Sequence, residues 1–352
     1  MTQKSKVFQA ASYVLPILLL PSLPAAEKKV VLGYSLGTST IQREQAGSTT
    51  DVRMPVMGFV VHSSPPELQP IYGIPGATLV GQSVPLARDI EKLSMVPAQT
   101  YALVERSPFT EISLMPVTGS GTGDPIPIPG AVSRADRIAF GPSGLTALLY
   151  SKDLQKAQVI SGLPSSPQIT REFDLSWLAA PLTAMAISDD AQAVLVGVSD
   201  EEGGSIMDIA PDGRARWLAR VGNATAIRFM RQTRDAAAAD LVGNQILHIM
   251  DITGTPTVAV LGSEIQGVNG PIDLDISEDG QRVFVLNFGD RSLLSIEVES
   301  GKTASLPCAF TPSKIRRLPG KSFLMTDAEG GVPWVLVTKD PAPGLFFVPS
   351  TQ

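Results

Sequence analysis

The sequence predicts an all-β chain in which a unit of four short strands recurs along almost its whole length. Short apolar runs alternate with turns rich in Gly, Asp, Ser and Pro, which is the pattern of short strands. The same strand–turn–strand pattern also returns at a nearly constant interval. A period of about 40–45 residues with four strands in each unit is typical of a β-propeller blade. We therefore expect one β-propeller domain.

Three segments carry the repeat most clearly. Residues 184–196 align without gaps with residues 273–285, and residues 138–149 form a third copy. Each consists of a short strand, a tight turn and a second strand. Asp and Ser side chains in these turns can bond to their own backbone, and Gly supplies the positive φ that a hairpin requires. The alignment therefore predicts the first two strands of three blades.

The second strand can be followed through seven copies. They begin near Phe59, Ala102, Ala147, Val194, Asp240, Phe284 and Phe323. Seven blades of about 45 residues need about 315 residues, and residues 27–352 are sufficient for them. We expect seven four-stranded blades, with six or eight as alternatives. A pair of β-sandwiches is the competing all-β fold, but it does not predict self-similarity at a long period.

The first 26 residues have the layout of a secretory signal peptide. Lys4 and Lys6 precede an apolar run over residues 13–23, and small residues then lead to Glu27. The run is shorter than the roughly 20 residues that a membrane-spanning helix needs. We expect residues 1–26 to be removed, or alternatively to stay as an uncleaved anchor. The propeller of residues 27–352 would then be periplasmic or extracellular, with no membrane span.

Ring closure needs the two ends of the propeller. A propeller must join its last blade to its first, because an open sheet edge invites aggregation. Residues 29–34 and 345–348 are both apolar and typical of strands. We expect both to lie in the terminal blade, with residues 29–34 completing a sheet built mainly from residues 312–350.

Composition excludes several classes of function. The chain has 28 basic and 34 acidic residues and a net charge of −6, which argues against a nucleic-acid-binding surface. One cysteine and two histidines leave too few ligands for a Cys or His metal cage, so we expect no metal and no cofactor. Cys308 lies in an apolar stretch, and we expect a buried, unreactive thiol.

The sixth repeat resembles that of a known family of propellers. Its Ser277-Glu278-Asp279-Gly280 turn, its Phe284-Val285-Leu286-Asn287 strand end and its Ser300-Gly301-Lys302 turn resemble the repeat of bacterial YVTN-type propellers, which are lactonase-like and WD40-like. In that repeat a proline stands where Glu278 is found, and Thr-Gly stands where Ser300-Gly301 is found. The resemblance implies a propeller fold. The family includes surface-layer repeats, binding scaffolds and lactonase-type enzymes, and it carries no catalytic motif over to this chain.

Polar side chains gather in the connections between second and third strands, which open on one fixed face of a propeller. The candidates for a ligand-binding face are His62, Arg106, Asp153, Asp200, Asn244, Asn287, Asp290 and Asp327. Mixed charges of this kind can line the mouth of a central channel. The alternative is that they are ordinary solvated hairpin tips.

We expect an exported, non-catalytic and monomeric binding scaffold that takes a protein, a glycan or a small ligand. The chain lacks the His-Glu-x-x-His and Gly-x-Ser-x-Gly motifs, so we assign no catalytic residue. One alternative is a lactonase-type or related hydrolase acting at the channel mouth, for which His62 and Arg106 are the nearest candidates. The other is a structural module of envelope assembly.

Overall fold

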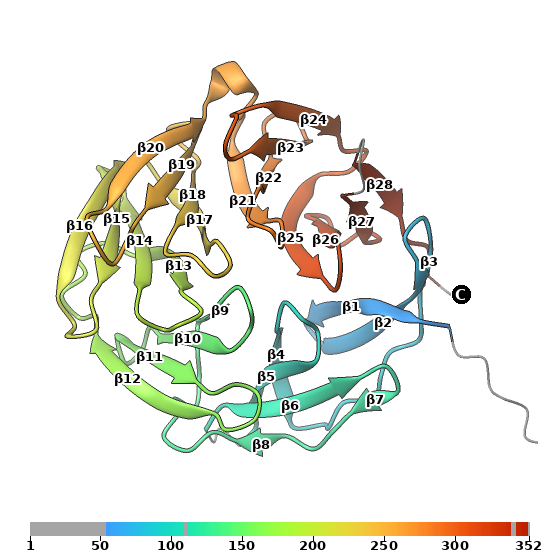
Figure 1. Cartoon of the computed structure of the whole chain (residues 1–352). Coiled ribbons are helices and arrows are strands. Elements are labelled where there is room, and N and C mark those ends of the chain that lie inside the picture. Colours follow the sequence, from blue (N-terminus) through green and yellow to red (C-terminus); the bar gives the residue numbers. More distant parts are fainter. Residues whose placement is uncertain (1–53, 109–110, 339–342, 351–352) are drawn as a thin grey trace, which may run out of the picture. The chain divides into compact units, whose positions relative to one another are not determined.

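The structure is a computed structural model that describes residues 54–108, 111–338 and 343–350. These residues form seven antiparallel sheets arranged around one axis, which confirms an all-β propeller of seven blades (Figure 1). The predicted signal peptide, residues 1–26, lies outside the described residues. Within them the one helix is a single turn at Glu264–Gln266 (η1), and no helix is long and apolar enough to cross a membrane.

The blades are numbered along the chain. Blade 1 contains β1 (Val56–Ser63), β2 (Pro66–Ile74) and β3 (Ala77–Val80). Blade 2 contains β4 (Ile90–Met95), β5 (Tyr101–Arg106), β6 (Ser113–Thr118), β7 (Gly121–Thr122) and β8 (Ile126–Pro127). Blade 3 contains β9 (Arg137–Phe140), β10 (Thr146–Ser151), β11 (Lys156–Ser161) and β12 (Gln168–Asp174). Blade 4 contains β13 (Leu182–Ile187), β14 (Val194–Asp200), β15 (Gly203–Ile209) and β16 (Ala215–Val221).

The last three blades follow the same order. Blade 5 contains β17 (Ala224–Phe229), β18 (Ala236–Asp240), β19 (Gln245–Met250) and β20 (Thr257–Gly262). Blade 6 contains β21 (Pro271–Ile276), β22 (Arg282–Asn287), β23 (Ser292–Glu297) and β24 (Thr303–Pro307). Blade 7 contains β25 (Pro312–Leu318), β26 (Ser322–Asp327), β27 (Trp334–Val337) and β28 (Gly344–Phe347).

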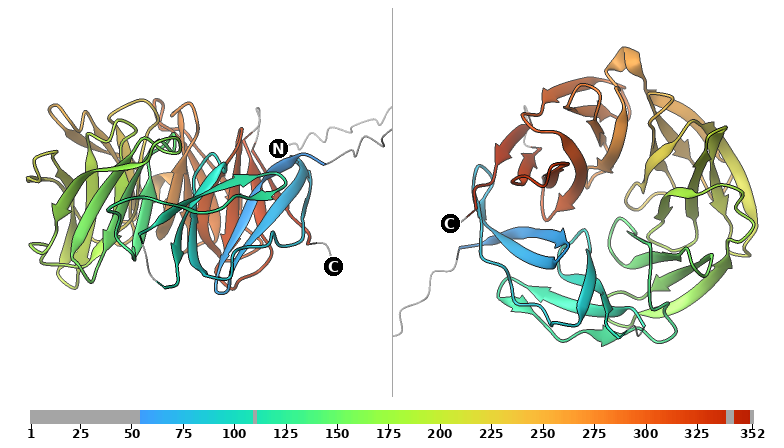
Figure 2. Two further views of the ribbon diagram at one scale, coloured as in Figure 1. Left: turned by 90° about the horizontal axis from the view of Figure 1, so that it is seen from below. Right: turned by 180° about the vertical axis from the view of Figure 1, so that it is seen from behind.

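In blades 3 to 7 the strands pair in sequence order, from the first strand near the axis to the fourth at the rim (Figures 1 and 2). The first strands β13, β17, β21 and β25 contact one another in succession and surround the central channel. Because neighbouring strands are antiparallel, the connections from second to third strands emerge on the face where the first strands begin. We call this side the loop face.

Blade 1 has three strands among the described residues. Val80, at the end of β3, pairs in parallel with Ser350, which follows β28. Strand β3 therefore runs in the direction of a fourth strand, and β1 holds the second position, as the repeat beginning at Phe59 predicts. The N–H of Phe59 donates to Gln99 Oε1 at 2.6 Å. No described strand lies on the inner side of β1.

Ring closure involves both ends of the described propeller. Blade 7 takes its four described strands from residues 312–347. The contact between Val80 and Ser350 joins this blade to the first one. Residues 29–34, which were expected to complete the terminal blade, lie outside the described part of the chain, so their place in the closure stays a prediction.

The apolar core lies between the blades. Val194 and Val196 of β14 face blade 3, whereas Phe284 and Leu286 of β22 face blade 7. The rings of Phe284 and Phe323 lie 4.9 Å apart. All four side chains thus lie between blades, because a strand with sheets on both sides buries both of its faces.

Blade 5 corrects the predicted repeat. Its second strand, β18, covers Ala236–Asp240, so Asp240 ends the strand rather than beginning it. The four alanines at 236–239 are all fully buried, and they alternate between the contacts with blade 4 and with blade 6. Alanine has a weak preference for strands. The residue pattern therefore does not reveal that residues 236–239 form a strand. Small side chains fit here because neighbouring sheets press on both faces.

Candidate functional site

The predicted ligand-face residues mostly hold their own turns. Asp200 Oδ1 accepts the N–H of Glu202 at 2.9 Å. Asp327 Oδ1 accepts the N–H of Glu329 at 3.1 Å. Asp290 Oδ1 accepts the hydroxyl of Ser292 at 2.7 Å, and Asp153 is exposed at a hairpin tip. These residues share the loop face but come from separate blades, and no contact between them brings their carboxylates together.

Two asparagines on this face connect loops. Asn244 Oδ1 accepts the N–H of Gly270 at 2.6 Å, and its amide nitrogen donates to Glu264. Asn287 is fully buried. Its Oδ1 accepts the N–H of Asn269 at 3.1 Å, and its Nδ2 donates to the carbonyl of Gly267 at 2.8 Å. The Asn287 side chain therefore has no exposed polar atom to offer a ligand.

The pair considered for hydrolase chemistry does not converge. His62 contacts Gln69 on the neighbouring strand, with 3.1 Å between Nε2 and Oε1. Arg106, on blade 2, bonds to Asp89 through Nε at 2.7 Å. Each side chain is thus engaged within its own blade. Among the described residues, no group of three or more His, Cys, Asp or Glu side chains is placed to hold a metal ion.

An open groove on blade 4 was missed by the sequence analysis. Two adjoining hollows of about 460 and 550 Å³ share Asp200, Glu202, Gly203 and Arg220 in their linings. We call them together the blade-4 groove. Trp177 and Trp217 line it, and 45% and 61% of their surfaces are exposed. A tryptophan in the loop after β12 and another on the outer strand β16 were the signals available in the sequence.

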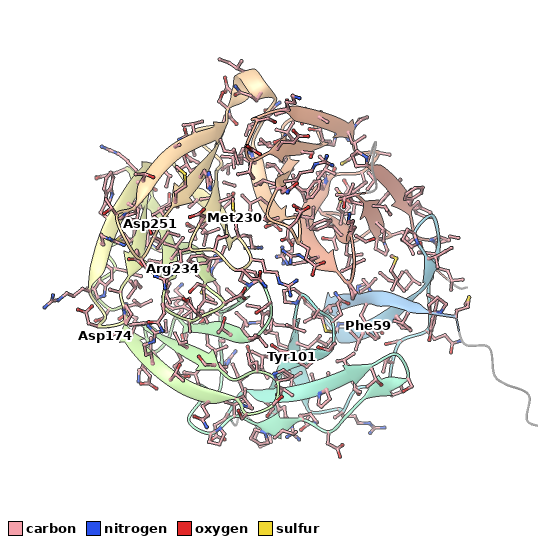
Figure 3. All side chains as sticks on the ribbon, in the orientation of Figure 1. Phe59, Tyr101, Asp174, Met230, Arg234 and Asp251 are labelled. Carbon is pink, nitrogen blue, oxygen red and sulfur yellow. The ribbon has the colours of Figure 1, made fainter. Side chains whose placement is uncertain are left out.

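The groove has a partly fixed wall and an acidic lining. The Trp177 indole N–H donates to the carbonyl of Asp174 at 2.9 Å. Asp174 ends β12 at the rim of the ring (Figure 3). The exposed charged residues of the lining are Asp200, Glu201, Glu202 and Arg220. Three carboxylates against one guanidinium give the groove a negative potential.

A second charged cluster lies on the inner strands. Asp273 of β21 is placed between two guanidiniums: Arg228 Nη2 approaches its Oδ1 at 3.2 Å, and Arg316 Nη1 approaches its Oδ2 at 2.6 Å. Asp273 also accepts the backbone N–H of Ile315 at 3.1 Å. One carboxylate thus joins the inner strands of blades 5, 6 and 7.

The surroundings of Cys308 and of His248, which lies on β19, shift the pKa values of both side chains. Burial, together with the nearby Asp290 carboxylate, raises the pKa of Cys308 to about 11, which keeps the thiol protonated. Burial lowers the pKa of His248, and Asp235 opposes this effect. The Cys308 side chain is half-buried rather than buried, and its raised pKa accords with the expected low reactivity.

Comparison with known proteins identifies the fold. No protein-family model and no curated protein sequence matches the chain. Hydrazine synthase of Kuenenia stuttgartiensis superposes with a TM-score of 0.57 at 14% identity, over 84% of this chain and 98% of that one. A catalytically inactive virginiamycin B lyase from Staphylococcus aureus with quinupristin gives a TM-score of 0.53 at 13% identity, over 75% and 87%.

The WD40 repeats of RRP9 give a TM-score of 0.54 at 10% identity, over 76% of this chain and 83% of that one. These neighbours differ in function, and identities this low establish a shared fold only. The comparisons therefore place the chain among β-propellers with WD40-like architecture.

Proposed function

We propose that this protein is an exported, non-catalytic scaffold whose blade-4 groove docks a basic, extended segment of a partner protein. The observation that carries the proposal is the pair of exposed tryptophans, Trp177 and Trp217, beside an acidic hollow. Exposed aromatic side chains are the residues that most often anchor protein interfaces. A lysine or arginine of the partner would lie over an indole face and near a carboxylate.

The physical argument is one of complementary charge. A cation over the face of a tryptophan is attracted by the ring quadrupole, and about 0.5–2 kcal/mol is gained for each such contact. The carboxylates of Asp200, Glu201 and Glu202 add attraction that salt can screen. Arg220 sets the register by repelling a cation placed directly beside it.

Export and family membership belong to the same proposal. The basic, apolar and small residues of positions 1–26 support export to the periplasm or the cell exterior. The repeat at residues 275–302 supports a relation to YVTN-type propellers. A monomer accords with a scaffold whose blades are closed on one another. The hydrolase alternative draws no support from His62 and Arg106, because each is bonded within its own blade.

Fluorescence titration tests the groove directly. Of the three tryptophans, Trp177 and Trp217 lie in the groove, so their emission reports its occupation. The probes are a Lys/Arg-rich peptide, a Glu-rich peptide of equal length and a neutral oligosaccharide. We expect the basic peptide to bind most tightly and its affinity to fall as salt is added. Preference for the acidic peptide or for the oligosaccharide would overturn the proposal.

Substitutions in the groove test whether the basic peptide binds there. Glu202→Gln removes a charge from the groove, and Trp217→Ala removes an aromatic wall. Each should weaken the basic peptide about three- to tenfold. Glu299→Gln is the matched control, because Glu299 is an exposed acid on a turn of blade 6. Equal affinities in Glu202→Gln and Glu299→Gln would contradict docking at the groove.

A further inference from the structure

The inner strands carry a charge opposite to that of the whole protein. The basic residues of the described first strands β4, β9, β13, β17, β21 and β25 are Lys92, Arg137, Arg228, Lys314, Arg316 and Arg317. Their acidic residues are Glu91, Asp273 and Asp275. These strands therefore carry three more basic than acidic residues, whereas the complete chain has a net charge of −6. Lys92 is paired with Glu105 of β5 at 3.2 Å, so the unbalanced charge belongs to the other inner strands. A local reversal of this kind concentrates anions.

Two of these cations lie near the loop-face ends of inner strands in different blades. Lys314 lies near the start of β25 in blade 7, and Arg137 begins β9 in blade 3. Burial, Arg316 and Arg137 lower the pKa of Lys314, and Asp273 partly opposes them. Blades 3 and 7 are not neighbours in the ring, and β9 and β25 are inner strands that both begin on the loop face. Both side chains therefore stand at the loop-face mouth of the channel.

Arg228 and Arg316 lie on the inner strands beside this mouth. Hydrogen bonds fix both guanidiniums and leave some of their N–H donors unused. Arg228 Nη1 donates to the carbonyl of Ile227 at 2.9 Å, and Arg316 Nη1 donates to that of Ile315 at 2.6 Å. Both guanidiniums also bond to Asp273. The Arg228 and Arg316 side chains nevertheless keep 28% and 47% of their surfaces accessible. A guanidinium has five N–H donors. Each of these two guanidiniums can therefore donate a further hydrogen bond to an oxygen atom of a ligand.

The neighbouring acids do not cancel this charge. Asp273 is shared by two guanidiniums and has 7% of its side-chain surface exposed. Asp275 accepts the N–H of Arg317 at 3.0 Å and lies 3.8 Å from that residue's guanidinium. The remaining positive charge of Arg137, Lys314 and one guanidinium beside Asp273 is unpaired by any carboxylate of the described inner strands. Gathering these groups without a counter-ion costs free energy, which an anion would recover.

We propose that the loop-face mouth of the central channel is a binding site for a small ligand with a phosphate or carboxylate group. Arg137 and Lys314 would contact its oxyanion from opposite sides, and Arg228 and Arg316 would supply hydrogen bonds from the channel wall. This site is separate from the blade-4 groove and does not rest on the proposed docking of a basic segment.

Isothermal titration with two probes tests the site on the full chain. Inorganic phosphate represents a phosphorylated ligand, and succinate represents a carboxylate. We expect at least one of them to bind at low ionic strength, to raise the Tm and to be displaced by added salt. Tighter binding of phosphate or of succinate identifies the group that the channel prefers. Binding of neither anion would overturn the proposal.

Three variants, each of which removes one positive charge, test where the anion binds. Lys314→Gln and Arg137→Gln each remove one cation from the mouth, and neither residue has an ion pair that folding requires. Each should weaken anion binding about tenfold. Arg214→Gln is the control, because Arg214 is 89% exposed on a turn of blade 4. If Arg214→Gln weakened binding as much as both channel variants, the anion would not lie in the channel and the proposal would fail.

Discussion

Val80 and Ser350 join the first blade of the propeller to the last. The two residues pair in parallel, and the N–H of Val80 donates to the carbonyl of Pro349 at 2.8 Å. The other strand pairs of the described sheets are antiparallel. This contact pairs the end of β3 with the end of blade 7, and pairing of strand edges limits association with other molecules.

Removing the closing segment should destabilise the ring. Deletion of residues 348–352 takes away the fully buried Val348 and the pairing with β3. We expect a Tm several degrees lower and the appearance of oligomers, since an exposed strand edge promotes association. Scanning calorimetry and size-exclusion chromatography measure the two effects. Deletion of residues 351–352 alone leaves the pairing intact and should change neither, and equal behaviour of both deletions would refute this closure.

The contact between blades 6 and 7 depends on one aromatic side chain. Phe284 is fully buried against Phe323, so Phe284→Ala leaves a cavity between two sheets. The free energy of unfolding should fall by about 3–5 kcal/mol, measured by chemical denaturation. Phe288 is 55% exposed, and Phe288→Ala should cost less than about 0.5 kcal/mol. A loss below about 1 kcal/mol for Phe284→Ala would contradict its place in the core.

Cys308 should react slowly and should make stability depend on alkaline pH. Burial raises its pKa to about 11 from an ordinary value of 9.0. At pH 8 the thiolate fraction falls about 100-fold relative to an unfolded thiol. Alkylation by iodoacetamide should therefore be far slower in the native protein than in the denatured protein. Equal rates would show that the thiol is accessible and ionised.

The same pKa gives the sign of the stability change. The unfolded thiol ionises near pH 9 and the folded thiol near pH 11. The contribution of the half-buried neutral thiol is fully present below pH 9 and is lost as the pH rises toward 11. Cys308→Ala removes this dependence, so the difference in Tm between the two proteins should change over that interval.

Processing of the N-terminus can be read directly. The order of basic, apolar and small residues over positions 1–26 predicts cleavage before Glu27. Protein recovered from the periplasm or the medium should begin at or near Glu27 by N-terminal sequencing. A cytoplasmic protein that begins at Met1 would contradict export.

Much of the blade architecture could be predicted from the sequence. The turn at Ser277-Glu278-Asp279-Gly280 lies between β21 and β22, and the matching turn at residues 188–191 lies between β13 and β14. Turn chemistry is local, because Asp and Ser bond to adjacent backbone and Gly adopts positive φ. Asp279 Oδ1 accepts the N–H of Gln281 in this way. Local signals repeated at a long period therefore predict the blade and favour seven copies of it.

Contacts between blades could not be predicted in the same way. The turn residue Asp189 accepts both the N–H and the hydroxyl of Ser143 at 2.6 Å, which joins blades 3 and 4. Nothing in the sequence near Asp189 distinguishes this role from that of an ordinary turn residue. The strand formed by the alanines of β18 could not be predicted for a similar reason. Small side chains are required there only because neighbouring sheets pack against both faces.

The sequence by itself determined an all-β propeller and favoured seven blades over six or eight, because its turns and apolar strands are encoded locally and repeat. Only the tertiary structure decided which polar residues gather. Asn287 is buried among loop backbones, whereas Arg228, Asp273 and Arg316 of three different blades form one charged cluster. Ring closure places distant side chains together, and electrostatic interaction depends on distance in space rather than along the chain.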